Sequence, residues 1–274
     1  TDSGWRIFWA TGHNEQPMQE TRRRILAALA DGPVTGPALA QELDVSRAAV
    51  WKHVDAIRAD GFTIDGGQQG YELVEVPEFG ATAVEFGLEA PFTIEYHDAI
   101  DSTNRRAREL APDGAQDVVV LADEQTGGRG RLDRQWSSPS GGIWMSVVLR
   151  PEVPPAHAPA FTLAAALAVT TAAREAGVDA AIKWPNDVVV PTAAADAGET
   201  AYGGPKLAGV LTEMEGEADR VSWLVLGMGI NVNVAADDLP SDAAATTIRE
   251  LVGDVDRRVF SQRVLERLDD ARTD

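Results

Sequence analysis

The chain is 274 residues long, 44% of them hydrophobic, and acidic residues outnumber basic ones by 43 to 24, which gives a formal net charge of −19. This composition supplies a packed core and excludes wholesale disorder, and the absence of cysteine excludes disulfides and thiolate metal sites, as in a reducing cytoplasm. The most apolar stretch, residues 158–173, is too short and too rich in alanine and threonine to span a bilayer, and no signal peptide is evident, so we expect a soluble cytoplasmic protein without a membrane partner.

The N-terminal part of the sequence predicts a short extension followed by a small helical domain. Residues 1–17 show neither helical nor strand periodicity, and we expect them to be a disordered extension. A winged helix-turn-helix is predicted for residues 18–76, because three amphipathic helices precede a hairpin around Gly66 and Gly67. The three helices are expected over residues 21–32, 36–45 and 46–61.

The third of these helices has the character of a DNA-reading helix. Its buried face is predicted from the i, i+4, i+7 spacing of Val50, Val54 and Ile57, and Ser46 can cap its start. Its opposite face carries side chains suited to phosphates and base edges, namely Arg47, Ala48, Trp51, Lys52 and Arg58. A module that binds only proteins is the alternative. Charge favours DNA, because residues 18–74 hold six basic and eight acidic side chains, whereas residues 75–274 hold 17 and 33.

A second domain is predicted for residues 77–274, with residues 77–87 as its linker and entry. Several strands follow one another without an intervening helix, which indicates a mixed or largely antiparallel sheet and an α+β fold. Strands are expected over residues 92–98, 117–124, 142–150, 180–190, 206–215 and 221–234, and helices over 103–111, 161–176 and 256–270.

The loop after the second of these strands has the composition of an anion-binding site. It contains the sequence GGRGR over residues 127–131. Successive glycines let backbone N–H groups converge on an anion, and Arg129 and Arg131 add two guanidinium forks suited to a carboxylate or a phosphate. Gln125 supplies a neutral donor and acceptor, and Trp136 a flat aromatic face. A plain basic turn would account for one arginine but not for this combination.

Four further segments carry candidate site residues, each of which also has an ordinary structural explanation. DSTN (101–104) could cap a helix or bind a neutral polar ligand. KWPND (183–187) places Lys183 and Asn186 at a turn between strands. KLAGVL (206–211) presents Lys206 at the start of a buried strand, and GMGIN (227–231) is a weak glycine signal that lacks the helix of a dinucleotide fingerprint.

Lysine is rare in this chain, which makes each lysine informative. The three are Lys52, Lys183 and Lys206. An acidic surface that uses arginine in place of lysine is typical of proteins from concentrated salt, where charge repulsion is screened within a few ångström. An ordinary acidic protein from a GC-rich genome is the alternative. In either case a retained lysine is a candidate for chemistry that arginine cannot perform.

In this order and spacing, the segments resemble the biotin protein ligase catalytic domain. With the helix-turn-helix in front, residues 18 to about 274 resemble the bifunctional form, a biotin ligase fused to the biotin operon repressor. The resemblance implies a catalytic domain of the class II aminoacyl-tRNA synthetase-like biotin/lipoate ligase type. The small C-terminal β-barrel of that family is absent from these 274 residues.

The resemblance also implies a reaction, partners and residue roles. Such enzymes form biotinyl-5'-AMP from biotin and ATP with Mg²⁺ and transfer biotin to a lysine of a biotin carboxyl carrier protein; bifunctional members bind operator DNA, and a homodimer is expected. Catalysis falls to Lys206, Arg131 and Lys183. Biotin contacts fall to Ser102, Thr103, Asn104, Gln125, Arg129, Gly130, Arg131 and Lys206, and ATP contacts to Arg129, Arg131, Trp136, Lys183, Asn186 and Asn231. No metal ligands are evident.

Two alternatives remain open at this point. A lipoate or octanoate ligase shares the domain type but would lack the GRGR loop. A biotin-sensing repressor without ligase activity would need its adenylation residues broken, and here they are intact. Pyrophosphate release with biotin and ATP would separate the last case from a ligase.

Overall fold

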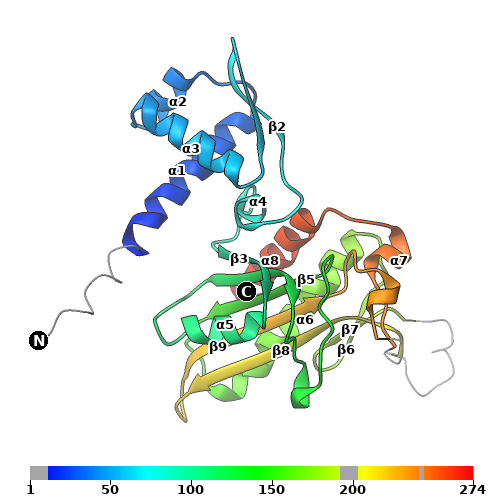
Figure 1. Ribbon diagram of the computed structural model, residues 1–274. Coiled ribbons are helices and arrows are strands. Elements are labelled where there is room, and N and C mark those ends of the chain that lie inside the picture. The colour runs from blue at the N-terminus through cyan, green and yellow to red at the C-terminus, as the bar shows by residue number, and fades with distance from the viewer. Residues whose placement is uncertain (1–11, 192–202, 241–243, 274) are drawn as a thin grey trace, which may run out of the picture. The chain divides into compact units, whose positions relative to one another are not determined.

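The computed structural model describes residues 12–191, 203–240 and 244–273, which belong to two compact units, Thr1–Gly87 and Leu88–Asp274. The first unit contains α1 (Gly12–Ala30), α2 (Gly36–Glu42), α3 (Arg47–Ala59), the hairpin β1 (Thr63–Gly67) and β2 (Gly70–Glu75), and α4 (Ala81–Glu85) (Figure 1). This is the predicted winged helix-turn-helix.

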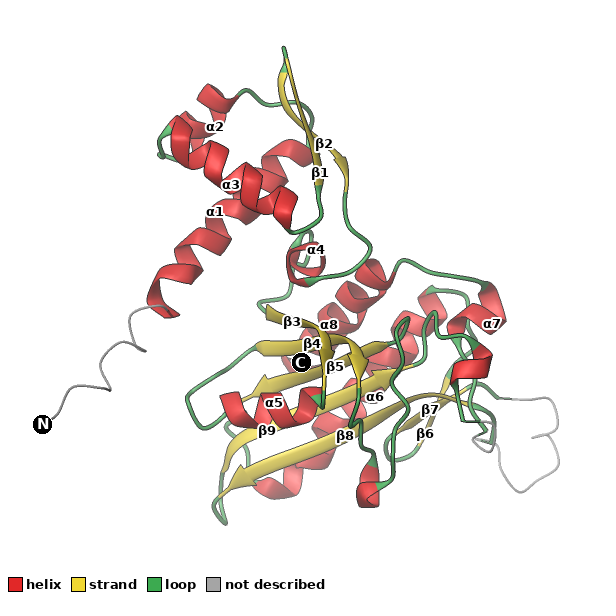
Figure 2. Cartoon of the chain, viewed as in Figure 1, coloured by secondary structure: helices red, strands yellow, loops and turns green. Residues whose placement is uncertain are grey.

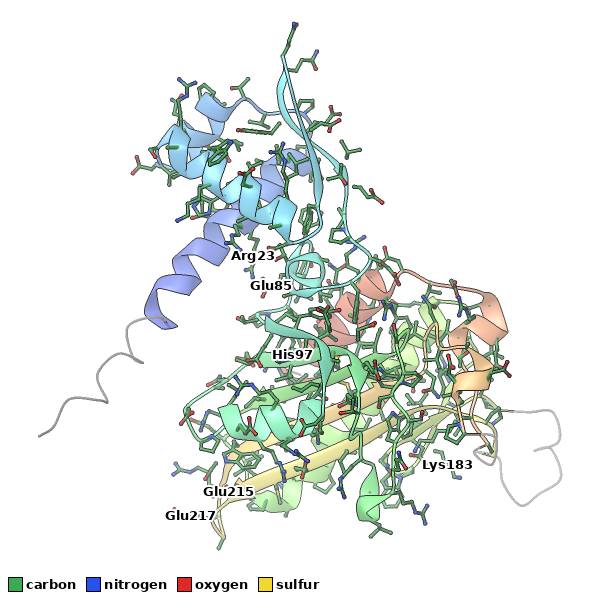
Figure 3. All side chains as sticks on the ribbon, viewed as in Figure 1. Arg23, Glu85, His97, Lys183, Glu215 and Glu217 are labelled. Atoms are coloured by element: carbon green, nitrogen blue, oxygen red, sulfur yellow. The ribbon has the colours of Figure 1, made fainter. Side chains whose placement is uncertain are left out.

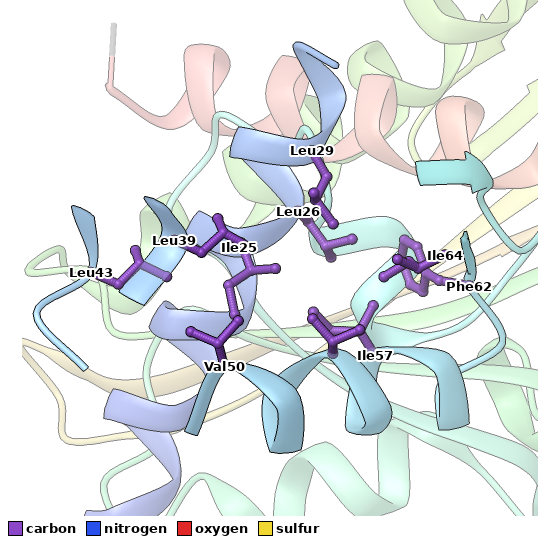
Figure 4. Close-up of a cluster of buried hydrophobic side chains, with 10 residues drawn as sticks. Ile25, Leu26, Leu29, Leu39, Leu43, Val50, Ile57, Phe62 and Ile64 are labelled. Carbon is purple, nitrogen blue, oxygen red and sulfur yellow. The ribbon is translucent and has the colours of Figure 1, made fainter. Parts of the chain in front are cut away.

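The first unit is held together by the apolar faces of its three longer helices. Ile25 and Leu26 of α1, Leu39 of α2 and Ile57 of α3 are almost completely buried and meet in one core with Phe62 and Ile64 of the wing (Figure 4). The side chain of Thr35 caps α2 and that of Ser46 caps α3. The caps fix where each helix begins, and the shared core fixes how the helices pack.

Between residues 12 and 76, the structure differs from the sequence-based expectation at the start of the first helix and at the turn of the hairpin. Helix α1 begins at Gly12, so residues 12–17 are helical, and residues 1–11 of the expected disordered extension lie outside the described residues. The hairpin turns two residues later than predicted, because Gly67 pairs with Gly70. Gly70 has a φ of 117°, and a Cβ there would collide with the carbonyl oxygen of Val34, so only glycine fits this turn.

The predicted linker, residues 77–87, belongs to the first unit and does not open the second. Its helix α4 packs against the winged helix core: the ring of Phe86 meets that of Phe62 edge-to-face at 6.1 Å. Thr82 Oγ1 donates to Asp60 Oδ2 over 2.7 Å. The boundary between the units therefore falls after Gly87 rather than after residue 76.

The second unit is built on one seven-stranded sheet with the strand order β3-β4-β5-β9-β8-β7-β6. Strands β3 and β4 are parallel and the remaining neighbours are antiparallel, so the predicted mixed sheet is confirmed. The strands are β3 (Thr93–Ile100), β4 (Val118–Gln125), β5 (Ile143–Leu149), β6 (Ala181–Lys183), β7 (Asp187–Val189), β8 (Lys206–Gly216) and β9 (Val221–Ile230).

Helices cover both faces of this sheet. Helix α5 (Thr103–Leu110) lies on one face, and α6 (Ala158–Glu175) and α8 (Arg257–Thr273) lie on the other, while the short α7 (Ile248–Val252) follows β9 (Figure 2). By length and composition, Pro155–Glu175 is the single helix among the described residues that could cross a membrane. Its alanine-rich side is buried in the core, as in the central helix of a globular domain.

A buried ion pair ties the start of α8 to the end of β4, directly before the glycine- and arginine-rich loop. Arg257 Nη1 lies 2.5 Å from Asp123 Oδ1, and Ser140 Oγ donates to Asp123 Oδ2 over 2.6 Å. Burial alone would raise the pKa of Asp123, but the bonds from Arg257 and Ser140 outweigh it and hold this pKa below its ordinary value. The charged pair therefore stabilises the fold above the ordinary aspartate pKa, and this contribution is lost as the pH falls through the lowered folded value.

We expect Arg257→Gln to lower the free energy of unfolding by about 3 kcal/mol at neutral pH, because Asp123 would be left charged and half-buried without a cationic partner. Urea unfolding followed by tryptophan fluorescence measures this. Arg263→Gln is the matched control, since Arg263 is 53% exposed in its pair with Glu266, and should change stability by less than about 1 kcal/mol. The deficit of Arg257→Gln should shrink as Asp123 becomes protonated at low pH; equal stability of the two variants would contradict this account.

Candidate active site

The floor of the candidate site is a patch of strand without side chains. Gly209 of β8 pairs with Gly229 of β9, and Gly227 pairs with both Leu211 and Ser146. A Cβ at Gly229 would lie 2.5 Å from Trp136 Nε1, and a Cβ at Gly227 would overlap the amide oxygen of Asn104. These glycines let the side chains of Asn104 and Trp136 lie directly on the sheet. A larger residue in place of either glycine would displace the side chain above it.

At one end of this floor, α5 and the neighbouring strands form a continuous polar network. The backbone N–H of Thr103 donates to Gln125 Oε1 over 2.8 Å, and the hydroxyl of Thr103 donates to the same oxygen over 3.0 Å. Gln125 Nε2 donates to Ser138 Oγ over 2.9 Å. Because Gln125 Oε1 is fixed by two donors, its amide orientation is determined, and the network can present defined donors and acceptors to a neutral polar ligand.

The same network continues to Asn104 and is anchored by a carboxylate. Ser146 Oγ lies 2.6 Å from Asn104 Oδ1, and Asn104 Nδ2 donates to Glu213 Oε2 over 2.8 Å. Glu213 is itself held by Arg108, whose Nη1 lies 3.0 Å from Glu213 Oε1. A carboxylate cannot donate, so it fixes which end of the Asn104 amide points toward the sheet.

At the other end of the floor, cations and an aromatic ring come together. Lys206 Nζ lies 2.6 Å from Asp187 Oδ1 and 4.8 Å from the centre of the Trp136 ring. Asn186 Nδ2 also donates to Asp187 Oδ1, over 3.2 Å, while Arg131 Nη1 donates to Asn186 Oδ1 over 2.8 Å. The hydrogen-bonded series Arg131–Asn186–Asp187–Lys206 links two cations, of which Lys206 lies over the aromatic ring.

These groups line two adjoining cavities. The smaller one, about 60 Å³, lies over the glycine floor and is lined by Ser102, Thr103, Asn104, Gln125, Arg129, Gly130, Arg131, Trp136, Met145, Asn186, Lys206, Gly209, Val210, Leu211, Gly227, Met228 and Gly229. The wider one, about 460 Å³, shares Trp136, Asn186 and Lys206 with it and extends to Asn231 and Pro240. One cavity thus offers polar recognition groups, and the next offers an aromatic wall with a cation.

Two buried polar atoms at this site have no hydrogen-bond partner among the described residues, namely Trp136 Nε1 and Asn231 Oδ1. Asn231 is 2% exposed and donates through Nδ2 to the carbonyl of Thr246, so its amide orientation is set and its oxygen is left as an acceptor. Orphaned buried polar atoms are costly unless a ligand satisfies them. Both belong to residues that line the wider cavity.

The structure brings nearly all the predicted site residues of the second unit together, with Lys183 as the exception. Lys183 is exposed at the end of β6 and is not among the residues lining either cavity (Figure 3). Its strand pairs it with Asp187, and neither cavity reaches its side chain. The roles of Lys183 in catalysis and in ATP contacts stay predictions.

Several site residues were missed by sequence reasoning. Asp187 was seen only as part of a turn, although it pairs with Lys206, and Ser146 and Glu213 were not singled out. Ser146 and Glu213 lie 42 and 109 residues from Asn104 along the chain, so no local motif connects them. The GMGIN segment was the available signal for the floor, because Gly227 and Gly229 belong to it.

In the first unit, three of the four predicted DNA-binding residues lie on the open face of α3. Arg47, Trp51 and Lys52 are exposed, Trp51 to 58%. Arg58 differs, because its guanidinium donates twice to the carbonyl oxygen of Ile64, over 3.0 and 2.6 Å. Arg58 therefore ties the wing to α3, and its contact with DNA stays a prediction.

Comparison with known proteins agrees with this division into two parts. Residues 96–231 match the model of the Biotin/lipoate A/B protein ligase family, and residues 21–72 match an HTH domain. The bifunctional ligase/repressor BirA of Bacillus subtilis (strain 168) is 37% identical over 243 residues, which cover 85% of this chain and 71% of that protein. The chain belongs to the BirA family of biotin protein ligases.

Other members of the biotin protein ligase family resemble the chain in sequence and structure. BirA of Escherichia coli (strain K12) is 28% identical over 252 residues, covering 89% of this chain and 74% of that protein. The biotin protein ligase from Aquifex aeolicus in complex with biotin and ATP superimposes with a TM-score of 0.53 at 31% identity, covering 65% of this chain and 69% of that one. The Leishmania major ligase in complex with biotinyl-5-AMP gives 0.52 at 27% identity, covering 66% and 74%.

Proposed function

We propose that the second unit joins the carboxylate of biotin to the α-phosphate of ATP and then transfers the biotinyl group to a lysine of a biotin carboxyl carrier protein. The main support is that one cavity over the glycine floor is lined both by a polar network and by a pair of cations. A second, larger cavity shares the two cations with it and could hold a nucleotide. This arrangement matches a ligand with a neutral polar ring at one end and a carboxylate at the other. Lipoate has no ureido group and would leave the polar network unsatisfied.

In this proposal the ureido ring of biotin binds the network of Thr103, Asn104 and Gln125. A ureido group carries N–H donors and one carbonyl acceptor, so it can satisfy fixed amide and hydroxyl groups at once. Ser102, Arg129 and Gly130 also line this cavity. The network confers selectivity because an analogue that cannot make these bonds leaves buried polar groups unpaired.

The reaction brings two anions together, and Arg131 and Lys206 offset their repulsion. A carboxylate oxygen of biotin attacks the α-phosphorus of ATP and pyrophosphate leaves, so negative charge accumulates where these cations meet. Lys206 must exchange its ion pair with Asp187 for contacts to the reacting groups. The compact ammonium can make this exchange by a small rotation.

The wider cavity, called the nucleotide cavity from here on, would hold the nucleotide. Trp136 offers a face to a base and Asn231 an orphaned acceptor, which suits the exocyclic amine of adenine. Mg²⁺ would accompany the phosphates and neutralise part of their charge. Asp187 is the carboxylate among the described residues lining this cavity, and Mg²⁺ commonly uses only one or two protein carboxylates together with substrate phosphates.

The direct test is transfer of labelled biotin to a carrier domain, with pyrophosphate release measured in parallel. Both should require biotin and ATP and should proceed at about 1 M salt, where charge is screened over ~3 Å, if the acidic surface is a salt adaptation. Transfer of octanoate or lipoate in place of biotin would replace this proposal with the alternative ligase. Biotin binding without pyrophosphate release would reduce the chain to a biotin sensor.

The first unit is proposed to bind operator DNA through α3, making the protein a biotin-responsive repressor in the cytoplasm. Arg47 and Lys52 are exposed cations that can neutralise phosphates. We expect Arg47→Ala and Lys52→Ala each to reduce the slope of log affinity against log salt by about 1, because each removes one phosphate contact. Fluorescence anisotropy on operator DNA measures this; unchanged slopes for both would place the DNA on another surface.

A homodimer is proposed from the open edge of the sheet. Strand β7 pairs with β8 only from Lys206 to Gly209, so the outer edge of β8 beyond Val210 has no neighbouring strand among the described residues. Such an edge presents unpaired backbone groups to a second strand. Light scattering with and without biotin and ATP tests the dimer, and a proline at Thr212 should weaken it if the edge is the interface.

A further inference from the structure

A third cavity lies beside the smaller of the two cavities, the one assigned above to biotin and called the biotin pocket from here on. The third cavity is lined by four arginines. It measures about 450 Å³ and shares Ser102, Asn104 and Leu211 with the biotin pocket. We name it the arginine vestibule. Its four arginines are Arg105 and Arg108 of α5, and Arg129 and Arg131 of the glycine- and arginine-rich loop after β4. None of the roles described so far uses Arg105, and Arg108 has been described only through its bond to Glu213.

The vestibule carries an excess of positive charge in a chain that is otherwise acidic. Glu213 is the single carboxylate among its described lining residues, and Arg108 already pairs with it. Arg105 pairs with Asp101, which lies outside the lining, and keeps 52% of its side chain exposed; Arg108 keeps 47%. Clustered guanidinium groups repel one another, so an open cavity lined by four of them favours an anionic occupant.

The position of the vestibule indicates whether its anionic ligand is a phosphate group of ATP or part of the second substrate. It shares six lining residues with the biotin pocket, among them the uncharged Ser102, Asn104 and Leu211. With the nucleotide cavity it shares only Gly130, Arg131 and Leu132. In an in-line displacement pyrophosphate leaves on the side opposite the attacking carboxylate, which is away from biotin. The vestibule therefore lies on the biotin side of the reacting centre, and Arg131, which lines all three cavities, brings it to the end where the carbonyl carbon of biotinyl-AMP would lie.

We propose that the arginine vestibule binds acidic side chains that flank the target lysine of the acceptor domain. This inference rests on the proposed ligase function, because it concerns the second half-reaction of the same site. Carboxylates of the partner would pair with Arg105 and Arg108 as forked contacts at the rim, which orients the acceptor and speeds its association. The lysine between them would then reach the carbonyl carbon of biotinyl-AMP.

The same positive charge suits the chemistry of transfer. A lysine attacks only as the neutral amine, and nearby cations disfavour its ammonium form, so more of it is unprotonated at neutral pH. The nitrogen lone pair adds to the carbonyl carbon, and the bond from that carbon to the phosphate oxygen of AMP breaks. AMP leaves with the electron pair, the amide forms, and the proton from nitrogen passes to solvent.

The test uses the full chain with two changes at Arg105, because Arg105 touches neither the ureido network nor Lys206. Arg105→Gln should raise the KM for a carrier domain about threefold, and Arg105→Glu about tenfold, at low ionic strength. Both effects should shrink at high salt. Arg263→Gln and Arg263→Glu are the matched controls, since Arg263 on α8 is similarly exposed at 53% and also pairs with a carboxylate close by in the sequence, and they should leave this KM unchanged.

Two further readouts separate this inference from the proposed function. Biotin-dependent pyrophosphate release, and capture of biotinyl-AMP by hydroxylamine, should stay within about twofold of wild type in both Arg105 variants, because neither needs the acceptor. A carrier domain whose acidic neighbours of the target lysine are changed to glutamine should lose its sensitivity to Arg105. An unchanged KM for the carrier domain in Arg105→Glu overturns the inference. A fall in pyrophosphate release as large as the loss of transfer also overturns it, because it would assign the vestibule to ATP. Absence of biotin-dependent pyrophosphate release by the wild type would instead refute the ligase function.

Discussion

Replacing Lys206 with alanine is expected to slow biotin adenylation by about 10²–10³-fold, the loss seen when one donor to a developing oxyanion is removed. The ammonium of Lys206 lies beside Trp136 and Asp187, between the biotin pocket and the nucleotide cavity. There it meets the carboxylate and the α-phosphate in the transition state more closely than in either substrate alone. The loss should therefore appear in kcat rather than in the affinity for biotin.

Lys206→Arg distinguishes charge from shape. A Cβ built on Gly209 would lie 3.0 Å from Lys206 Nζ, which shows how closely the ammonium sits on the glycine floor. A guanidinium is wide and planar and does not fit where a compact ammonium rests against the backbone. We expect Lys206→Arg to remain nearly as slow as Lys206→Ala, although it keeps the charge.

Single-turnover formation of biotinyl-AMP measures both variants, with biotin affinity determined separately by calorimetry. Lys52→Ala is the control, because it removes a lysine from the other unit and should adenylate biotin at the wild-type rate. Adenylation by Lys206→Ala within a few-fold of wild type would remove Lys206 from the mechanism. Recovery of most of the rate by Lys206→Arg would show that only the field of a positive charge is needed.

The fold could be predicted from the sequence because its elements are marked locally. The caps at Ser46 and Ser102, the alternation in the strands and the run of strands without helices each depend on near neighbours in the chain. The loop GGRGR was recognisable because arginines between glycines have no structural purpose of their own. Resemblance to a known family then supplied the roles that residue types alone do not determine.

What the sequence could not predict depends on partners far apart in the chain. Phe86 was assigned to a linker because its contact with Phe62 crosses a turn and a hairpin. Arg58 was assigned to DNA because its helix face was predicted but not the carbonyl of Ile64, which the wing brings within 2.6 Å. Lys183 was grouped with Asn186 by proximity in sequence, but Asn186 lines both cavities of the site and Lys183 lines neither.

The glycines of the GMGIN segment show the same limit most clearly. In sequence they lack the helix that would mark a dinucleotide fingerprint, so they carry little weight. In the structure Gly227 and Gly229 are strand residues whose missing side chains make room for Asn104 and Trp136. The need for glycine comes from what lies above the strand, and the chain contributes Asn104 and Trp136 from about a hundred residues earlier.

Gly227→Ala is accordingly expected to raise the KM for biotin by about 100-fold or more while the fold persists. The new methyl group would overlap Asn104 Oδ1, and the amide cannot simply swing aside because Ser146 and Glu213 hold both of its ends. Displacing Asn104 breaks these bonds and leaves buried polar groups unpaired, a cost of about 1–3 kcal/mol for each group. Two or more such groups together give the predicted factor, since every 1.4 kcal/mol is tenfold.

The control for this change is Gly67→Ala, at a strand glycine whose added Cβ would meet nothing within 4 Å. It should leave biotin binding and adenylation unaltered. Calorimetry with biotin, together with circular dichroism to verify the fold, measures the effect of Gly227→Ala. A second change, Asn104→Ala in the Gly227→Ala background, removes the group that the methyl overlaps. If steric conflict with Asn104 is the cause, the double variant should bind biotin no worse than Asn104→Ala alone; a further loss in the double variant, or normal binding by Gly227→Ala, would show that the floor does not act through Asn104.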